Sequence, residues 1–458
     1  MNPRFEMPDN YYFGGGGGTF VTPLALVFLL LAIGFLFWLP RKYALIPFLL
    51  VGLLLPVQVT IVFYGFHLMA FRLLLLAAWV RCLLRREYRG SPKSSIDKVV
   101  LFWAFSNAIA FVLLWREPAS IANRLGFLYQ SLGTYFLLRC FIREENDVIR
   151  VIKAFVLVVA ITAPLMLYES TTGYNGFSIL GAPAMSSIRE GRVRAEGPFL
   201  HPIIAGTVGA ILFPLSIGLW QQGGKHRLIA CVGIISSTLA TVTSASSTPI
   251  MTYAAGLLGL IVFRARKQMR ALRWGFVLSL LGLQLAMKAP VWFLISRLSG
   301  FGGGTGWHRA ALVDNFIRRF SDWWLIGTRN NADWGYYMWD VDNAYVAAGV
   351  GGGLITFLLF IGVIVYAYKA VGEARRTTEG FPSQLRLVWA LGCALFANTV
   401  AYFGILYFDQ SIIVWYALLA MIAAGPGFLA HPLRSQPAKP TLQNVRHLQT
   451  RPTEYFCG

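Results

Sequence analysis

Long apolar runs separated by short polar stretches form the dominant pattern of this chain. A helix of roughly 17–22 apolar residues is long enough to cross the ~30 Å hydrocarbon core of a membrane. Thirteen runs of that length lie near residues 21–40, 44–63, 66–84, 99–115, 121–141, 148–168, 199–220, 228–244, 248–264, 274–292, 345–368, 386–406 and 410–429. The second and third runs nearly touch. We therefore predict an all-α polytopic integral membrane protein with twelve or thirteen transmembrane helices.

The polar stretches between the runs are short, apart from two long connections near residues 169–198 and 293–344. The second connection is predicted to form one large loop on the side of the membrane away from the cytoplasm. Residues 1–20, with the run Gly14–Gly18, are typical of a flexible lead on that same side. Residues 431–458 are Pro-rich and basic, which is typical of a disordered cytoplasmic tail. The membrane domain is thus predicted to span residues 21–430.

Composition agrees with this picture. The chain is 56% hydrophobic and 13% charged, with a mean hydropathy of +0.59, whereas soluble chains are about 25% charged. The five cysteines form no CxxC pair and have no metal-ligand spacing, so neither a disulfide framework nor a zinc site is indicated, and no cofactor is predicted. The first apolar run follows a single arginine and lacks a small-residue cleavage site, so it is expected to stay as an anchor.

The net charge of +20 would favour nucleic acid as the partner of a soluble protein. Placing the amino terminus outside puts most of the 40 Lys and Arg residues on the cytoplasmic side of the predicted spans. This distribution follows the positive-inside rule. The charge therefore indicates orientation in the membrane, membrane lipids are the expected surroundings, and nucleic acid is excluded.

The positive-inside rule makes arginine scarce on the outer side, so the arginines found there are informative. Guanidinium binds phosphate bidentately and keeps its charge, which suits it to a diphosphate ligand. Contact with lipid phosphates or acidic neighbours is the alternative, and we favour it for Arg318 and Arg319. For Arg194 and Arg309 we favour a functional role. The outer arginines in or beside spans and long loops are Arg72, Arg124, Arg189, Arg192, Arg194, Arg297, Arg309, Arg318, Arg319 and Arg329.

A general base on this side needs reach and a tunable pKa. The candidates are Glu196, His201, His308, Asp340 and Asp342. Asp342 directly precedes a predicted span, so it is also a candidate helix N-cap. His201 precedes Pro202 and is also a candidate for a structural hydrogen bond at a helix start. Asp340 and Asp342 form the only DxD-like pair on the outer side, which disfavours a soluble nucleotide-sugar donor held by a metal.

The long loop near residues 293–344 contains five of the 14 tryptophans. They are consistent with an aromatic belt at the membrane interface, and also with stacking against sugar rings. Within the loop, HRAALVDNFIRRF is predicted to form a short helix along the membrane surface, with Val313, Phe316, Ile317 and Phe320 on one side and Arg309 at the start of that face.

Four segments together resemble the superfamily of O-antigen ligases and Wzy-type polysaccharide polymerases, which are bacterial inner-membrane glycosyltransferases. RAEGPFLHPIIAG (Arg194 to Gly206) is similar to its R-x-x-G-x-F-x-x-P segment. HRAALVDNFIRRFSDWWLIGTR (His308 to Arg329) resembles its R-xx-L segment in the large periplasmic loop. DNAYVAAGVGGGLITFLLF (Asp342 to Phe360) resembles the H-N-x-Y-L stretch with its G-x-x-G. SIIVWYALLAMIAA resembles its last, Trp-containing helix.

The resemblance implies a glycosyltransferase that joins undecaprenyl-diphosphate-linked oligosaccharide units at the periplasmic face. It implies that Arg194 and Arg309 hold the lipid diphosphate and that Asp342 orients or deprotonates the acceptor hydroxyl, in an inverting transfer independent of metal. Flippase and chain-length regulator proteins would be further partners. The supporting substrate-binding candidates are Arg72, Arg124, Arg192, Glu196, His201, His308, Arg329, Asp340 and Tyr345.

Two departures from the family pattern favour the polymerase branch. The ligase branch usually has histidine where this chain has Asp342, and its S-R-G is here SASSTPIM (residues 244–251), without arginine. An O-antigen ligase that uses lipid A–core as acceptor remains the alternative within the enzyme class. A transporter of lipid-linked oligosaccharide or polysaccharide is the alternative from another class, although it predicts internal repeats and charges at the membrane midplane. A structural subunit of a synthase complex is the third.

Overall fold

A computed structural model describes residues 18–63, 66–298, 306–425, 428 and 458 of the chain. The predicted flexible lead and the predicted disordered tail therefore lie almost entirely outside the described residues, as does the glycine-rich part of the long loop, residues 299–305.

Helices make up most of the described chain. Two short pairs of antiparallel strands lie between helices. The α-helices are α1 (Pro23–Trp38), α2 (Arg41–Leu54), α3 (Ala70–Leu84), α4 (Ser95–Trp115), α5 (Pro118–Phe141), α6 (Glu145–Thr172), α7 (Pro202–Trp220), α8 (His226–Thr243), α9 (Ser247–Ile261), α10 (Met269–Ala286), α11 (Leu294–Leu298), α12 (Gly306–Arg318), α13 (Phe320–Trp323), α14 (Ala344–Thr377), α15 (Pro382–Ala401) and α16 (Ile412–Ala423). The 3-10 helices are η2 (Gly176–Leu180), η3 (Val262–Gln268), η4 (Val291–Phe293), η6 (Ala332–Trp334) and η7 (Asp409–Ser411). The strands are β1 (Thr60–Phe63), β2 (Phe66–Met69), β3 (Ser187–Arg189) and β4 (Arg192–Arg194).

Each of the thirteen predicted spans overlaps a helix, so the all-α membrane class is confirmed. In the part of the chain that the structure describes, seven helical stretches are long and apolar enough to cross a membrane, with α9, η3 and α10 forming one of them. Two further apolar helices, α1 and α16, are shorter. The seven are fewer than the predicted twelve or thirteen for three reasons: four apolar runs form helices of only 12–16 residues, the runs of α9 and α10 form a single stretch, and α5 has 24 residues but is not among the seven.

The prediction of two complete spans over residues 44–63 and 66–84 is wrong in its middle part. Leu55 is extended, as expected for the residue before Pro56, and α2 therefore ends after 14 residues. The β-branched sequence that follows forms the β1–β2 hairpin, with Thr60 opposite Met69. Helices α2 and α3 are thus about 21–23 Å long, shorter than the ~30 Å hydrocarbon core.

Local capping signals set several helix ends. Ser94 accepts a hydrogen bond from the Ile96 amide (3.3 Å), while Asp97 accepts one from the Ser94 amide (2.8 Å) at the start of α4. Helix α6 ends at Gly173, whose φ of 78° is left-handed. The polar residues that begin and end these helices lie between the apolar runs, which is why the helices follow the runs so closely.

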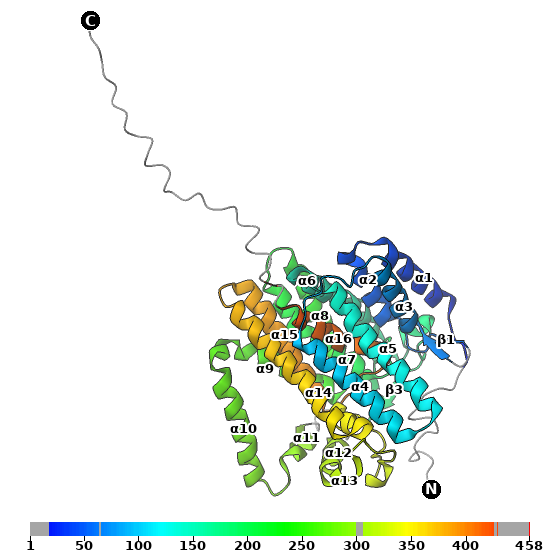
Figure 1. The fold of residues 1–458 in the computed structure, drawn as a ribbon, viewed down its shortest axis with the longest axis vertical. Coiled ribbons are helices and arrows are strands. Elements are labelled where there is room, and N and C mark those ends of the chain that lie inside the picture. The colour runs from blue at the N-terminus through cyan, green and yellow to red at the C-terminus, as the bar shows by residue number, and fades with distance from the viewer. Residues whose placement is uncertain (1–17, 64–65, 299–305, 426–427, 429–457) are drawn as a thin grey trace.

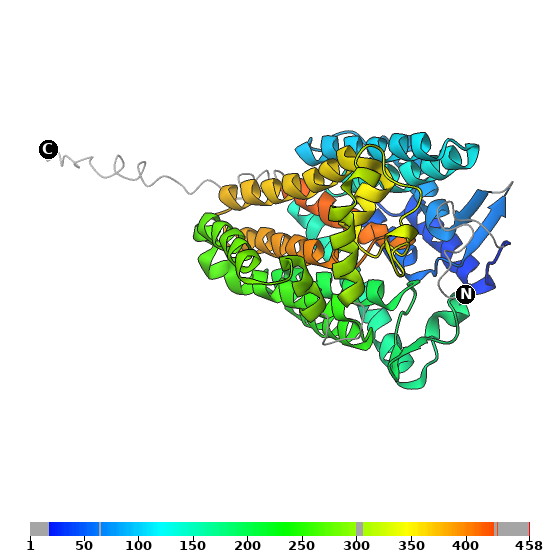
Figure 2. The same ribbon diagram turned by 90° about the horizontal axis from the view of Figure 1, so that it is seen from below.

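The helices pack as a layered bundle (Figures 1 and 2). Helices α4 and α5 lie along one side and α7, α8 and α9 on the other, with α14, α15 and α16 between them. Helix α16 is buried over almost its whole surface, as expected for a helix that is apolar all round. Helix α10 stands apart from the bundle in Figure 1, and none of its side chains is buried.

Contacts between loops and helix ends define the two ends of the bundle. At one end, Gln410 Nε2 donates to the Pro198 carbonyl (3.0 Å) and the Ala344 amide donates to the Tyr402 carbonyl (2.9 Å). At the other, Gln384 Nε2 donates to Glu145 Oε2 (2.7 Å) and Ser91 Oγ to the Arg139 carbonyl (2.8 Å). We call the first the site end and the second the opposite end. Both long connections of the sequence contribute to the site end.

Helix α14 is broken near its start. Gly353 has a φ of 74° and a ψ of −174°, and a Cβ there would lie 2.5 Å from the Leu325 carbonyl oxygen. The broken backbone bonds to the long loop: the Thr328 amide donates to the Val350 carbonyl (2.9 Å) and the Leu354 amide to the Trp324 carbonyl (2.7 Å). The glycines of this stretch therefore let the long loop pack directly against the helix backbone.

Candidate functional site

Two arginines from distant segments meet on the turn between α8 and α9. Arg194 Nη2 donates to Ser246 Oγ (2.7 Å), and Arg309 Nη1 donates to Ser247 Oγ (3.4 Å). Both arginines are buried, with 8% and 2% of their surfaces exposed. Burial, then the charges of Arg189 and Arg309, lower the pKa of Arg194, so these guanidinium groups act on one another.

The β3–β4 hairpin carries Arg194 into this position. Its two-residue turn has positive φ at Glu190 (52°) and Gly191 (74°), the geometry that tight hairpins prefer. The register pairs Ser187 with Arg194 and Arg189 with Arg192, which places the three arginines on one face. Arg194 is buried at the inner end of the hairpin, whereas Arg192 is exposed at its tip.

The chain just after Arg194 is fixed by a buried carboxylate that sequence reasoning missed. Glu169, at the end of α6, is fully buried and accepts the amides of Glu196 (2.9 Å) and Gly197 (3.0 Å). The Ala195 amide donates to the Thr243 carbonyl (3.2 Å). These contacts hold the backbone next to Arg194 against α6 and α8.

Asp342 connects the start of α14 with α12. Arg309 Nε donates to Asp342 Oδ2 (3.1 Å), and His308 Nδ1 lies 3.9 Å from Asp342 Oδ1. His308 Nε2 lies 2.9 Å from the Tyr337 carbonyl, which only accepts hydrogen bonds, so Nε2 carries the proton there. Asp342 Oδ1 has no hydrogen-bond partner among the described residues. One oxygen of Asp342 is thus engaged by Arg309, and the other is buried beside His308 without a hydrogen bond.

The alternative role of Asp342 as a helix N-cap is wrong. The N-cap of α14 is the next residue, Asn343, whose Oδ1 accepts the amides of Tyr345 (3.0 Å) and Val346 (3.2 Å). For His201, by contrast, the structural alternative holds in modified form, because its Nδ1 accepts the Ile203 amide (3.2 Å) rather than donating. His201 is the N-cap of α7, and Pro202 follows at the first helical position.

The charges of the arginines also affect the pKa of His201. Its ring keeps an exposed surface. The surrounding protein, and then the charges of Arg194, Arg309 and Arg189, lower the pKa of His201 to about 4. The ring is therefore neutral at physiological pH, and the positive charge at this end of the molecule resides on the arginines.

Two other carboxyl groups of the site end have raised pKa values. Burial and then the charge of Glu169 raise the pKa of Glu196 to about 7, against an opposing effect of Arg194. Burial and then the charge of Asp342 raise the pKa of Asp340, against an opposing effect of His308. Asp340 therefore lies close enough to Asp342 and His308 to interact with both.

Three further neighbours of the arginines gave no signal in the sequence. A Cβ on Gly404 would lie 2.8 Å from the guanidinium carbon of Arg309 and 2.6 Å from Thr248 Oγ1, so the backbone after α15 touches the guanidinium. Ser246 and Ser247 belong to the SASSTPIM stretch, where the sequence showed only a missing family arginine. In the fold this stretch provides the hydroxyl groups that both arginines bind.

The remaining predicted binding residues have partners elsewhere in the bundle. Arg72 donates to Gln130 Oε1 of α5 (3.3 Å) and Arg124 donates to Asn107 Oδ1 of α4 (2.7 Å), and both bonds tie neighbouring helices together. Arg329 donates to the carbonyl of Trp115 (2.9 Å) at the end of α4. Tyr345 donates to the Thr399 carbonyl (2.8 Å) in α15. None of these contacts involves Arg194, Arg309 or Asp342.

The long loop forms its own small core. Trp323 stacks on Phe316 with ring centroids 3.9 Å apart, and both rings pack near Phe357 of α14. The predicted helix over HRAALVDNFIRRF is confirmed as α12, which ends at Arg318, so Phe320 of the predicted apolar face belongs to the next helix, α13. Phe316 is buried with Arg309, whereas Ile317 and Phe320 are 48% and 45% exposed. The loop core rotates the helix so that Arg309 faces the protein interior.

In the described ranges, no group of three or more His, Cys, Asp or Glu side chains is arranged to hold a metal ion. The polar groups that converge on the turn between α8 and α9 are instead two guanidinium groups, two serine hydroxyl groups that accept hydrogen bonds from them, and one carboxylate that is partly engaged. Such an arrangement suits an anion that carries several oxygens. Comparison with models of known families and with curated proteins finds no match for this chain.

Proposed function

We propose that this chain is a glycosyltransferase of the bacterial inner membrane that polymerises undecaprenyl-diphosphate-linked oligosaccharide units at the periplasmic face. The observation that carries the proposal is the meeting of Arg194 and Arg309, two buried arginines 115 positions apart in the chain, beside Asp342, whose Oδ1 makes no hydrogen bond within the described residues. Buried like charges are costly unless a ligand or partner compensates them. A diphosphate is the compensating ligand proposed here.

In the proposed reaction the anomeric carbon of the donor glycan is transferred from the diphosphate oxygen to an acceptor hydroxyl. The acceptor C–O bond forms as the bond to the diphosphate breaks, with inversion at the anomeric carbon. Arg194 and Arg309 stabilise the negative charge that develops on the departing diphosphate. Asp342 Oδ1 receives the hydroxyl proton, while Arg309 holds Oδ2 and so fixes the orientation of the carboxylate.

The arrangement of the bundle supports a site at the membrane surface. Arg194, Arg309 and Asp342 come from loops and helix starts at the site end, beside the buried ends of α7, α9 and α14. The positive-inside rule assigns this end to the periplasm. A lipid-linked donor would then present its diphosphate at the level of the headgroups, where the arginines lie.

A transporter is less well supported. Broken helices in transporters leave backbone groups free to line a central site. In α14 the break at Gly353 is filled by the long loop, because Thr328 and Trp324 take up the freed groups of Val350 and Leu354. The break therefore has a packing explanation.

The test uses the full chain in lipid vesicles with an undecaprenyl-diphosphate oligosaccharide as the sole substrate. We expect a ladder of longer products, and Arg194→Ala and Arg309→Ala should each lower the rate of lengthening by about 10²–10³-fold. The matched control is Arg318→Ala, whose side chain is 70% exposed and pairs with Asp314 on the same helix as Arg309.

The outcomes separate the alternatives. Lengthening that persists in both arginine variants would show that the diphosphate is held elsewhere. Product formation only after addition of lipid A–core would identify a ligase. Movement of substrate across the vesicle membrane without a new glycosidic bond would identify a transporter.

A further inference from the structure

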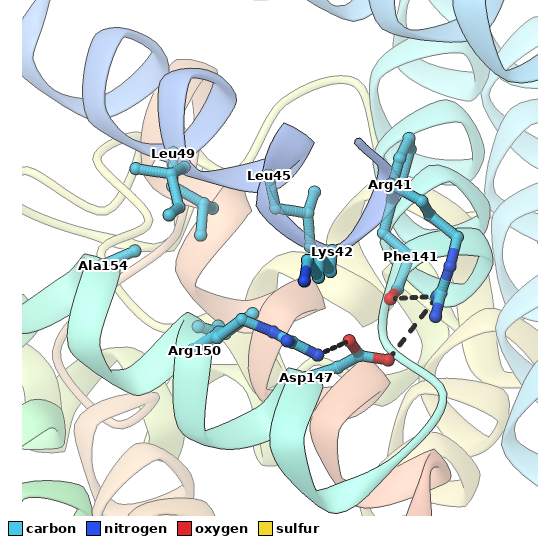
Figure 3. Close-up of a pocket in the computed structure, with 10 residues that line it drawn as sticks. Arg41, Lys42, Leu45, Leu49, Phe141, Asp147, Arg150 and Ala154 are labelled. Carbon is cyan, nitrogen blue, oxygen red and sulfur yellow. Dashed lines mark hydrogen bonds and ion pairs between the residues drawn. The ribbon is translucent and has the colours of Figure 1, made fainter. Parts of the chain in front are cut away.

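Glu169, near the end of α6, is a fully buried carboxylate without a countercharge. Asp147, in the first turn of the same helix, is compensated by two arginines: its Oδ2 lies 3.5 Å from Arg41 Nη1 and its Oδ1 lies 2.5 Å from Arg150 Nη2 (Figure 3). Within the described residues, the Glu169 carboxylate forms no such ion pair. Because a buried charge is costly unless it is compensated, its other partners are informative.

The hydrogen-bond partners of Glu169 belong to the segment that carries Arg194. Oε1 accepts from Ser186 Oγ (2.8 Å) and from the Glu196 amide (2.9 Å), and Oε2 accepts from the Gly197 amide (3.0 Å). Ser186 directly precedes β3, and the other two residues closely follow β4. One carboxylate therefore holds both strands of the hairpin at their base.

The neighbouring hydrogen bonds at this base run between backbone groups and an amide side chain of the segment itself. The Ser186 amide donates to the Gly173 carbonyl (3.1 Å), and Asn175 Nδ2 donates to the Gly197 carbonyl (2.8 Å). They shape the segment, whereas Glu169 ties both of its strands to a helix of the bundle. Hydrogen bonds to an ionised acceptor are also stronger than those between neutral groups.

The position of Arg194 depends on this backbone. Its guanidinium donates to Ser246 Oγ (2.7 Å), and the structure describes no ion pair that would draw the side chain into the site. The base of the hairpin therefore decides how far Arg194 reaches toward Arg309. We call these two arginines, together with the turn between α8 and α9, the anion site.

Glu169 also affects the charge next to the anion site. Burial, and then the charge of Glu169, raise the pKa of Glu196 to about 7, against the opposing charge of Arg194. Residues 244–246, in the turn between α8 and α9, are serine and alanine, and the ring of His201 at the start of α7 is neutral at this pH. A large share of Glu196 is therefore uncharged at neutral pH, and it compensates Arg194 only in part.

From these contacts we infer that Glu169 is a positioning residue for the anion site. It fixes the hairpin that brings Arg194 to Ser246, and it lies beside Glu196, so that this second carboxyl group does not fully neutralise the arginine. The inference rests on the proposed diphosphate site. It goes further, because it assigns the geometry and the charge of that site to a residue that touches no substrate.

Binding of a donor analogue that cannot be transferred tests the inference on the full chain in detergent. The analogue is an undecaprenyl-diphosphate oligosaccharide in which a methylene group replaces the oxygen between the anomeric carbon and phosphorus. At pH 7, Glu169→Gln should weaken its affinity about tenfold, because an amide cannot accept the same three hydrogen bonds. The matched control is Glu117→Gln, which removes an exposed carboxylate before α5 that caps no amide and should leave affinity unchanged.

The pH profile separates a positioning role from a merely structural one. The diphosphate diester of the analogue does not titrate near neutral pH, so changes in affinity report on the protein. Wild-type affinity should fall as the pH rises through about 7, where Glu196 ionises. In Glu169→Gln this fall should occur about one pH unit lower, because the charge that opposes ionisation is gone. Ser186→Ala, which keeps that charge and removes one hydrogen bond, should weaken affinity about threefold with the wild-type profile.

Three results would overturn part or all of the inference. Wild-type affinity in Glu169→Gln, or in Ser186→Ala where the first variant does not fold, would mean that the hairpin does not depend on Glu169. An unchanged pH profile in Glu169→Gln would mean that its charge does not act on Glu196. Arg194→Ala tests the proposed function separately: it should weaken binding about 30-fold or more, and wild-type affinity there would refute the diphosphate site itself.

Discussion

The two ends of the bundle both bury arginine, but they compensate its charge in different ways. At the opposite end, Arg81 is fully buried and binds Glu87 through two hydrogen bonds of 2.9 and 2.8 Å. Arg139 binds Asp97 at 2.9 Å in the same manner. At the site end, Arg194 binds a serine hydroxyl, and the structure describes no ion pair for it within 4.0 Å.

Glu196 is the carboxyl group whose charge acts on Arg194, and it compensates that charge only in part. The pKa of Glu196 is raised to about 7, so a large share of it is protonated at neutral pH. Arg194 is therefore surrounded by Arg189, Arg309 and a carboxyl group that is only partly ionised. At the opposite end the buried arginines form ion pairs that hold helices and loops together. At the site end the charge of Arg194 is left for a bound anion to compensate.

The largest effect on stability is expected at the opposite end. Arg81→Ala leaves Glu87 without its partner at a buried site and should lower the free energy of unfolding by about 3–5 kcal/mol. Thermal unfolding of the purified protein in detergent measures this loss. Arg89→Ala removes an exposed arginine of the same loop and serves as control, with an expected change below about 0.5 kcal/mol. Equal losses in the two variants would erase the proposed difference between the ends.

Asp342→Asn tests the site end. The amide cannot receive a proton, so the rate of glycan lengthening should fall about 100-fold or more. The free energy of unfolding should fall by less than in Arg81→Ala, because the ion pair with Arg309 is lost but the amide oxygen still accepts a hydrogen bond from Arg309 Nε. The helix start is unaffected because Asn343 provides the cap. Retained lengthening in this variant would remove Asp342 from the proton transfer. Steady-state rates and thermal unfolding of the same preparation provide both readouts.

Glu196→Gln tests whether Glu196 is partly protonated at neutral pH, through the pH dependence of the free energy of unfolding. The folded-state pKa of about 7 lies above the ordinary value of 4.5, so the folded protein binds this proton more tightly than the unfolded chain does. The wild type should therefore lose stability as the pH rises from about 5 to about 8. The variant lacks this loss, and at pH 8 it should exceed the wild type by roughly 2–3 kcal/mol.

Thermal unfolding at pH 5 and pH 8 measures this difference. Glu379→Gln removes an exposed carboxylate from the loop before α15 and should follow the wild-type profile at both values. If Glu196→Gln had the same pH profile as wild type, the pKa of Glu196 would not be raised by burial.

Most of the fold could be predicted from the sequence because the length of an apolar run is a local property of the chain. Each of the thirteen apolar runs overlaps a helix. The failure at residues 55–69 has the same origin, since a β-branched strand pair and a short helix are both apolar, and Pro56 was the only local sign of the change. The helix that carries Arg309 was predicted, but the packing of Phe316 against Trp323, which buries one side of it, is a tertiary contact that no periodicity reveals.

The candidate site was predictable in part for a different reason. The rule for membrane orientation directed attention to ten arginines on the predicted outer side, and Arg194 and Arg309 were the two favoured for a functional role. The groups that receive them, Ser246, Ser247 and Gly404, are common residues whose role depends on tertiary contacts. Glu169 was missed because it lies at the end of an ordinary apolar run, and its ligands are backbone amides that the sequence does not distinguish.

The smallest effect distinguishes Asp342 from its neighbour. Asn343→Ala removes the side chain that accepts the Tyr345 and Val346 amides, so the free energy of unfolding should fall by about 1 kcal/mol. The rate of lengthening should fall much less than in Asp342→Asn, because the Arg309–Asp342 pair remains. Asn343→Ser keeps a neutral capping oxygen and should restore part of the lost stability. A variant pair in which Asn343→Ala is the more damaging to lengthening would show that the helix start, and not the carboxylate beside Arg309, governs activity.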